Sequence, residues 1–297
     1  MRYVVWKGEI VDRAAAVVGA MSISAQFGLS VFEGIRGYRQ ESGGLALFRF
    51  ADHIGRLRSS AQVLAIQFPY ADAQILELVQ KVTDANNIKD DFAIRIILVC
   101  IDEGSWSSSV KPEVLIAPVL RQRIPIEDLL IQRASVVEIE RLHAQSMPPS
   151  VKVGANYVNS RLGYLEAKSL GFDVPLFLNR FGFLSESAGA NIGLFVDGTL
   201  ITPALDQDIL AGITRDTLLE LHRRSGGLTE ERAVRPDEIQ SSDELFLCGT
   251  AVEVLPLITP NVSSIGHQHT RCLAEKYRQC VTGKSICNSD WLVNLDL

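Results

Sequence analysis

Segments with apolar residues at helical spacing and segments of continuous apolar residues are mixed along the first third of the chain. Within 51–66 the apolar side chains recur at every third or fourth position, which predicts a helix with one buried face, and 73–86 also reads as a helix. Continuous apolar runs typical of strands lie between and around these helices. The runs are 2–6, 45–50, 92–100 and 113–120. Because strands and helices are mixed without a strict βαβ rhythm, the pattern predicts an α+β lobe.

Beyond this lobe the chain carries many short strand-like runs separated by turn residues. The sequences NRFG and VDGTL each join two such runs, as the turns of hairpins do. Helical patterns return at 158–170, 214–225 and 270–281. The second part is therefore expected to form a larger lobe with a largely antiparallel or barrel-like sheet plus helices.

Length and composition indicate where the two lobes are joined. A chain of 297 residues is long for one compact domain and sufficient for two. The segment RQRIPIEDLL at 121–130 differs in composition from its surroundings and contains Pro125, which cannot continue a central strand. We expect a small N-terminal α/β domain at 1–120, an interdomain loop at 121–132 and a large domain at 133–297.

Charge and hydrophobicity exclude several kinds of partner. The formal net charge is -6 and no Lys/Arg-rich run is present, so nucleic acid is not an expected partner. The first apolar run is broken by Lys7 and Glu9, and no stretch of about 18 uncharged apolar residues occurs. A membrane partner is not expected, and the expected location is the cytoplasm.

The cysteines, the histidines and the short motifs narrow the chemistry further. The five cysteines are an odd set without CxxC spacing, which argues against a disulfide framework, so most are expected to be reduced. Only His267 and His269 are close in sequence, and no carboxylate or cysteine adjoins them, so no metal is expected. Neither GxGxxG after a first strand, nor a P-loop, nor GxSxG is present, so these nucleotide and serine-hydrolase sites lack support.

Lys152, in SVKVGANYVNSR at 150–161, is a candidate for covalent chemistry. It lies between Val151 and Val153, whereas the other lysines lie in charged or amphipathic surroundings. A lysine amine that is removed from water becomes nucleophilic, as Schiff-base chemistry requires. A lysine in a surface loop is the simpler alternative, so this segment needs support from elsewhere in the chain.

Three further segments offer polar groups to a ligand. Gly212 precedes a helix opened by Thr214, and the bare N–H groups of a helix start bind anions. An apolar strand breaks at Gly249 and Thr250, and Glu186 sits among small residues that a flat ligand could approach. Taken singly, an ordinary N-cap and a plain bulge are the favoured interpretations of the first two segments, and a solvated turn glutamate explains the third at least as well.

The combination of these segments is more specific than any one of them. In this order and spacing, the motifs resemble those of fold type IV pyridoxal-phosphate-dependent enzymes, most closely the branched-chain amino acid aminotransferases. The resemblance covers nearly the whole chain and implies a two-domain fold whose larger lobe binds pyridoxal 5'-phosphate. The motifs are FEGIRGY (32–38), DHIGRL (52–57), IRI (94–96), SVKVGANYVNS (150–160), FLSESAGAN (183–191), GITRD (212–216) and GTAVE (249–253).

Carried over position by position, the resemblance implies a set of cofactor residues. It makes Lys152 the Schiff-base lysine and Glu186 the partner of the protonated pyridine nitrogen, while Tyr157 would hydrogen-bond the cofactor's phenolic oxygen. A guanidinium group, a helix start and a threonine hydroxyl would hold the phosphate. These phosphate ligands are Arg56, Ile213, Thr214 and Thr250.

The same resemblance implies a substrate site. Phe32 and Arg36 match the family pattern, and Arg95 matches an arginine that often receives the second carboxylate of glutamate. Backbone N–H groups of Thr250 and Ala251 would receive the α-carboxylate of the substrate.

The chain departs from the branched-chain pattern at several substrate positions. Ala93 replaces a tyrosine and Ile96 a proline, which is expected to remove a hydroxyl donor and to open space. Ala190 replaces a customary glutamate, and the loop 103–112 replaces a glycine-rich segment that closes the pocket. Trp106 in this loop could cap a larger or aromatic side chain.

The implied activity is transfer of an amino group between an amino acid, branched-chain-like or larger and aromatic, and a 2-oxo acid such as 2-oxoglutarate. In it, Lys152 also moves the α-proton. Alternatives on the same scaffold are a D-amino acid or R-selective amine transaminase and an aminodeoxychorismate-type lyase. A catalytically silent protein is disfavoured by the intact pair of Lys152 and Glu186. Because a second subunit completes the pocket in this family, a homodimer is implied, with Phe27 of the partner subunit near the substrate.

Overall fold

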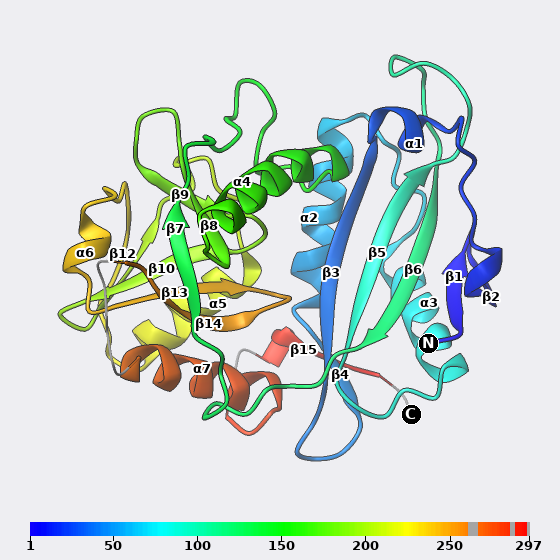
Figure 1. The fold of residues 1–297 in the computed structure, drawn as a ribbon. Coiled ribbons are helices and arrows are strands. Elements are labelled where there is room, and N and C mark those ends of the chain that lie inside the picture. The colour runs from blue at the N-terminus through cyan, green and yellow to red at the C-terminus, as the bar shows by residue number, and fades with distance from the viewer. Residues whose placement is uncertain (261–266, 286–288, 296–297) are drawn as a thin grey trace. The chain divides into compact units, whose positions relative to one another are not determined.

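The computed structural model describes residues 1–260, 267–285 and 289–295. Within it the chain forms two compact units, each of which contains its own sheet (Figure 1). Unit 1 contains Met1–Arg123, Val151–Ala155 and Cys280–Leu297, and unit 2 contains Ile124–Ser150 and Asn156–Gln279. The segment around Lys152 is therefore part of unit 1, although it is flanked in sequence by unit 2 on both sides.

Unit 1 is built on an antiparallel sheet with the order β15-β4-β3-β5-β6-β1-β2 among the described residues. The long strands β3, β5 and β6 form its centre, because each pairs over most of its length with its neighbour. The strands are β1 (Tyr3–Trp6), β2 (Glu9–Asp12), β3 (Ser30–Arg39), β4 (Leu45–Phe48), β5 (Phe92–Cys100), β6 (Pro112–Leu120) and β15 (Leu292–Leu295).

Helices α2 (Phe50–Val63) and α3 (Asp72–Ala85) pack on one face of this sheet, and the short helix α1 (Ile23–Phe27) lies beside β5. Their apolar residues at helical spacing meet alternate residues of the strands in one hydrophobic core. Fully buried members of this core include Ile35, Ile54, Leu57, Ile75, Val79, Ile94 and Ile96. The alternate residues of β3 and β5 lie on the opposite face of the sheet.

Unit 2 is built on a sheet that closes on itself. The order is β12-β11-β10-β13-β14-β7-β8-β9, and β9 pairs with β10 as well as with β8, so the strands from β10 to β9 form a barrel-like ring. Closure removes the unpaired edges that an open sheet would have. The strands are β7 (Gln132–Val136), β8 (Val174–Leu178), β9 (Leu184–Ser187), β10 (Asn191–Val196), β11 (Thr199–Pro203), β12 (Thr229–Arg232), β13 (Glu244–Gly249) and β14 (Glu253–Ile258).

The helices of unit 2 surround this sheet. They are α4 (Tyr157–Ser169), α5 (Ile213–Arg224), α6 (Glu238–Ser241) and α7 (Gln268–Val281), the last two residues of which belong to unit 1. Three short 3-10 turns complete the described elements: η1 (Arg13–Ala15), η2 (Gly154–Asn156) and η3 (Ser289–Trp291). Leu176, Leu194 and Leu247 are among the buried residues inside the sheet.

Most elements predicted from the hydrophobic pattern are confirmed within about two residues at each end. The hairpins at NRFG and VDGTL are confirmed as β8–β9 and β10–β11. The pattern missed the long strand β3, because Glu33, Gly34, Arg36 and Gly37 interrupt its apolar run. Three of these four residues are buried, so partners within the fold must compensate for the polar groups.

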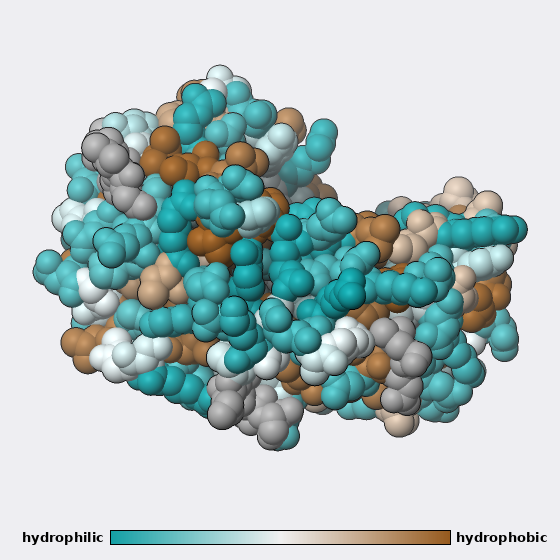
Figure 2. Space-filling model, turned by 90° about the horizontal axis from the view of Figure 1, so that it is seen from below, coloured by the Kyte–Doolittle hydropathy of each residue, from teal (hydrophilic) through white to brown (hydrophobic). Residues whose placement is uncertain are grey.

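Surface properties and cysteines agree only partly with the sequence expectations. Hydrophilic residues cover most of the face in Figure 2, with apolar residues between them. In the part of the chain that the structure describes, no helix has the length and apolar character needed to cross a membrane. Cys100, Cys248 and Cys272 are free thiols, whereas Cys280 is disulfide-bonded, which the scattered cysteines did not predict. Cys287 lies outside the described residues.

Candidate active site

The backbone around Lys152 is fixed by two elements of unit 1. The Phe32 N–H on β3 donates to the Lys152 carbonyl oxygen at 3.1 Å, and the Lys152 N–H donates to the Ser60 Oγ of α2 at 3.1 Å. A bridge between Val31 and Val153 extends the contact with β3. Since Val151 and Val153 are buried in the core of unit 1, the intervening lysine is held beside the sheet with its side chain half-buried.

Strand register places the predicted substrate residues of unit 1 on one face of the sheet. Gly34 pairs with Arg95, and Arg36 pairs with Ala93, while Phe32 lies two positions before Gly34. Because side chains two residues apart in a strand share a face, all five positions face away from the core that α2 and α3 cover.

Two cationic groups lie near the aromatic ring of Phe32. The Lys152 Nζ lies 5.2 Å from the ring centroid, and the Cζ of Arg95 lies 5.1 Å from it. Both distances permit attraction between the cations and the ring face. Arg36 differs from Arg95 because it is buried and its Nη2 donates to the Arg121 carbonyl oxygen at 2.8 Å, whereas Arg95 is exposed.

Beneath this face, Glu33 holds Arg56 through a buried network. Arg56 donates Nε–H to Glu33 Oε1 at 2.6 Å and Nη2–H to Oε2 at 2.9 Å, and His53 Nδ1 lies 2.8 Å from the same Oε2. Burial lowers the pKa of His53, so the neutral ring donates its Nδ1–H to the carboxylate. Although burial alone would raise it, the hydrogen bond from His53 and the charge of Arg56 lower the pKa of Glu33 to about 2.

Unit 2 contains a second buried carboxylate, Glu186. Its Oε1 accepts from Arg141 Nη2 at 2.7 Å and from Arg141 Nε at 3.1 Å. Its Oε2 accepts from Asn191 Nδ2 and from the Leu210 N–H, both at 3.1 Å. Glu186 lies on β9, and the sequence alternative of a solvated turn glutamate is wrong because the residue is buried.

Asn191 ties this carboxylate to the start of α5. Besides Glu186, its Nδ2 reaches the Leu210 carbonyl oxygen at 3.0 Å, and its Oδ1 lies where a Cβ on Gly212 would stand. Gly212 is the N-cap of α5, so the N–H groups of Ile213 and Thr214 belong to the first turn of this helix. Thr214 is buried, as is expected if this helix start faces a ligand inside the fold.

The remaining predicted residues lie at loop and helix ends. Thr250 and Ala251 lie in the turn between β13 and β14, where Thr250 is half-buried and Ala251 is exposed, so the predicted break in this strand is confirmed. Tyr157 is the first residue of α4, and Phe27 is the last of α1; both are partly exposed.

The structure shows where the residues that depart from the branched-chain pattern lie. Ala93 lies on the face that carries Arg95, so its small side chain leaves room there. Ile96 does not open space at this face, because it points into the core, where it is fully buried. Ala190 is buried beside Gly249, and Trp106 is 71% exposed in the loop before β6.

Sequence reasoning missed Glu33, His53, Arg141 and Asn191. Glu33 had a detectable signal, because it alternates with Val31 and Ile35 on the core face of its strand, where a lone charge requires partners. His53 lies three residues before Arg56 on one helix face. Arg141 lies in a segment without regular structure, and its spacing from Glu186 carries no such signal.

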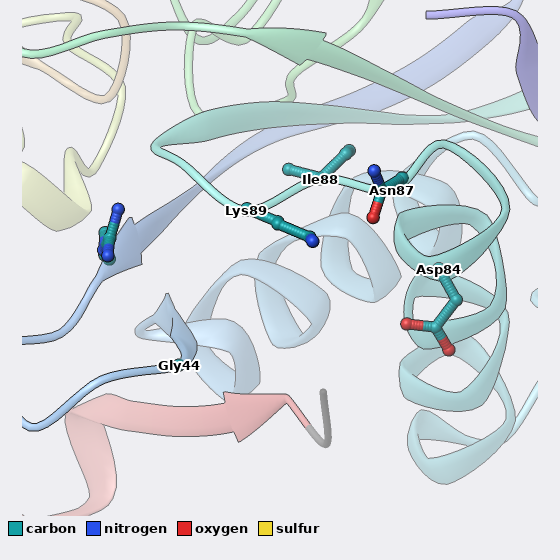
Figure 3. Close-up of a pocket in the computed structure, with 6 residues that line it drawn as sticks. Gly44, Asp84, Asn87, Ile88 and Lys89 are labelled. Atoms are coloured by element: carbon teal, nitrogen blue, oxygen red, sulfur yellow. The ribbon is translucent and has the colours of Figure 1, made fainter.

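A separate hollow in unit 1 is not the candidate site. It encloses about 410 Å³ and contains none of the predicted site residues, because it lies between the end of β3 and the loop that follows α3 (Figure 3). Its lining residues are Arg39, Gly44, Asp84, Asn87, Ile88 and Lys89. Among the residues that the structure describes, no group of three or more His, Cys, Asp or Glu side chains could hold a metal ion.

Comparison with known proteins assigns this geometry to a family. The model of the class IV amino-transferases matches residues 30–258. A probable branched-chain-amino-acid aminotransferase of Aquifex aeolicus is 31% identical over 98% of this chain and 96% of its own length.

Solved structures agree with the sequence match. A branched-chain aminotransferase of Thermoproteus uzoniensis, solved with norvaline, superposes with a TM-score of 0.93 at 32% identity and 99% coverage of both chains. A branched-chain amino acid aminotransferase of Thermobaculum terrenum in its PLP form superposes with a TM-score of 0.92 at 30% identity, covering 100% of this chain and 99% of its own.

The residues present fit pyridoxal phosphate, which carries an aldehyde, a phosphate and a basic ring nitrogen. A half-buried lysine can take the aldehyde, and a helix start without a Cβ at Gly212 suits the phosphate. Glu186, which already accepts from a buried arginine, can face the protonated ring nitrogen. The family match, the fold type IV neighbours and this donor set agree. The chain belongs to the class IV aminotransferases and is a pyridoxal-phosphate-dependent transaminase.

Proposed function

We propose that this transaminase moves an amino group between a hydrophobic amino acid, branched-chain-like or larger, and a 2-oxo acid such as 2-oxoglutarate. The observation that carries the proposal is the sheet face of unit 1. On this face Lys152 and Arg95 both lie near the Phe32 ring, so a reactive amine, an apolar surface and a carboxylate-binding cation lie together. An amino acid with an apolar side chain and a dicarboxylic 2-oxo acid need these three features.

Each proposed cofactor residue is assigned one role. Lys152 is the covalent attachment point for the aldehyde, and Glu186 keeps the ring nitrogen protonated. Tyr157 bonds the phenolic oxygen, while the phosphate is held by a guanidinium, a helix start and a hydroxyl. These phosphate ligands are Arg56, Ile213, Thr214 and Thr250.

When bound, the cofactor serves as an electron sink and carries the amino group between the two halves of the reaction. The chain's own part is to orient the substrate and to move one proton. With the cofactor bound, the Lys152 Nζ would accept the α-proton of the substrate and later donate it again. The half-buried setting of Lys152 beside Phe32 supports this role, because it limits the access of water to the reacting atoms.

Substrate binding is proposed to use two carboxylate sites and an apolar surface. Thr250 and Ala251 receive the α-carboxylate through backbone N–H groups, and Arg95 receives the second carboxylate of the acceptor. Phe32 and the space left by Ala93 accommodate an apolar side chain, and Trp106 supplies an aromatic surface for larger donors. The structure of the Thermoproteus uzoniensis relative with norvaline supports an apolar donor.

We also propose a homodimer, in which Phe27 of the partner subunit lies near the substrate. The first turns of α4 support this, because Val158, Leu162 and Leu165 recur at helical spacing on an exposed face. Light scattering should give twice the chain mass, and a monomer with full activity would contradict the dimer. The range 133–297 remains the proposed cofactor-binding domain.

Spectroscopy of the bound cofactor tests the function. The purified protein should be yellow, an amino donor should bleach this band, and a 2-oxo acid should restore it. The variant Lys152→Ala should lose both steps, while Lys168→Ala, which removes an exposed lysine of α4, should retain them. Bleaching that no 2-oxo acid reverses would contradict a transaminase, and a response to D-amino acids alone would contradict the proposed donors.

A further inference from the structure

The side chain of Arg141 connects two parts of unit 2 that the proposed function assigns to the cofactor. Its Nε and Nη2 donate to Glu186 Oε1, while its Nη1 donates to Asn159 Oδ1 at 3.0 Å and to Ser160 Oγ at 3.3 Å. Asn159 and Ser160 belong to the first turn of α4, which begins at Tyr157. The guanidinium carbon also lies 5.5 Å from the centroid of the Phe177 ring on β8.

Both members of the Arg141–Glu186 pair are removed from water. The side chain of Arg141 is 8% exposed and that of Glu186 is 4% exposed. An isolated carboxylate at such a depth is strongly disfavoured, and losing one partner of a buried pair leaves the other charge without compensation. Arg141 therefore supplies the opposite charge beside Glu186, whereas Asn191 and Leu210 contribute neutral donors.

The donors also fix the direction in which Glu186 faces. Oε1 accepts two N–H groups from Arg141, and Oε2 accepts one each from Asn191 and Leu210, so both oxygens are held by donors of the fold. A carboxylate held at both oxygens cannot rotate without breaking several hydrogen bonds. A ring N–H must therefore approach an oxygen whose position is already set.

We propose that Arg141 is a positioning residue that maintains Glu186 as an oriented carboxylate for the cofactor's ring nitrogen and fixes the first turn of α4 beside it. This inference rests on the proposed role of Glu186 and assigns no direct contact between Arg141 and the cofactor. It predicts that the two residues are energetically coupled in the protein without cofactor, and that the coupling is transmitted to the bound cofactor.

The first measurement is a double-mutant cycle on the full chain without cofactor, followed by urea unfolding. Arg141→Gln should increase the unfolding equilibrium constant by more than about tenfold, because it leaves Glu186 buried without its cation. Adding Glu186→Gln should recover most of this loss, since no buried charge remains. If Arg141→Gln fails to fold while the double variant folds, the coupling is confirmed in a stronger form; additive effects would overturn the proposal.

The second measurement concerns the cofactor. Arg141→Gln should weaken the binding of pyridoxal phosphate by about tenfold and should make its absorption band depend on pH, as supporting residues around a site do. Arg141→Lys, which keeps the charge but loses the planar fork, should recover part of both properties. Arg133→Gln, which removes an exposed arginine paired with Asp173 in the same unit, is the control and should change neither.

The outcomes separate this inference from the proposed function. Coupling in the cofactor-free chain together with wild-type cofactor affinity and absorption in both Arg141 variants would overturn the positioning role while leaving the transaminase proposal intact. A wild-type chain that attaches no pyridoxal phosphate at Lys152 would instead refute the proposed function, and the Arg141–Glu186 pair would then be structural only.

Discussion

Replacing Glu33 by glutamine removes the one anion from the buried network that holds Arg56 in unit 1. The change is nearly isosteric, so it leaves the volume of the site intact and alters its charge. In the wild-type protein the pKa of Glu33 is lowered from 4.5 to about 2, chiefly by the hydrogen bond from His53 and the charge of Arg56, which together exceed the effect of burial. At 1.36 kcal/mol for each pKa unit, the network stabilises the folded carboxylate by about 3 kcal/mol.

The expected loss of stability for Glu33→Gln at pH 7 is therefore about 3 kcal/mol, similar to the loss of one partner from other buried pairs. Because the folded pKa lies below the unfolded one, the stabilisation is complete above about pH 5 and is lost as the pH falls toward 2. The difference between wild type and variant should shrink to roughly half near pH 3.

Urea unfolding of the cofactor-free protein at a series of pH values measures this difference. Asp90→Asn is the matched control, because it removes a carboxylate of the same unit that is exposed and paired with Arg39 at 3.3 Å. That variant should lose less than about 1 kcal/mol. A loss for Glu33→Gln that is no larger than the control's, or one that does not change between pH 7 and pH 3, would refute the reasoning.

Three further substitutions test particular contacts. Gly193→Ala places a Cβ against the ring of Phe246, so it should lower the free energy of unfolding by about 1–3 kcal/mol. Adding Phe246→Leu should recover part of this loss, and an unchanged melting temperature of Gly193→Ala would contradict the packing. Gly212→Ala displaces the Asn191 amide, so titration should show weaker binding of pyridoxal phosphate with little change in the donor preference. Ala93→Tyr fills space on the sheet face that carries Arg95, so kcat/KM for large aromatic donors should fall relative to kcat/KM for valine. If the ratio of these two kcat/KM values does not change, position 93 does not line the donor site.

The sequence and the structure agree where local pattern dominates. Helices α2, α3 and α5 follow from apolar spacing, because one stripe of each is buried. Strand β3 was not predictable from its apolar residues, since Glu33 is tolerated on the core face only because His53 and Arg56 come from another element. Such compensation depends on tertiary contacts that no local window contains.

The candidate site divides in the same way. Lys152 and Glu186 could be named from motifs because their chemical roles require particular residue types. The donors that surround Glu186 could not, since Arg141 and Leu210 are distant from it in sequence and only the folded barrel brings them within hydrogen-bond distance. Whether the Ile96 side chain faces the core could also not be predicted without the strand register, because a shift of one residue moves a side chain to the opposite face of the sheet.

The order of the chain through the two units has a consequence for protein engineering. Unit 1 is assembled from three stretches of sequence, of which the last contributes β15 to the edge of its sheet beside β4. A gene fragment that ends near residue 120 would encode neither this edge strand nor the segment Val151–Ala155. The resulting protein would leave the edge of β4 unpaired and would lack Lys152. Independent expression of this unit therefore requires a rearranged gene in which these three stretches are fused by linkers.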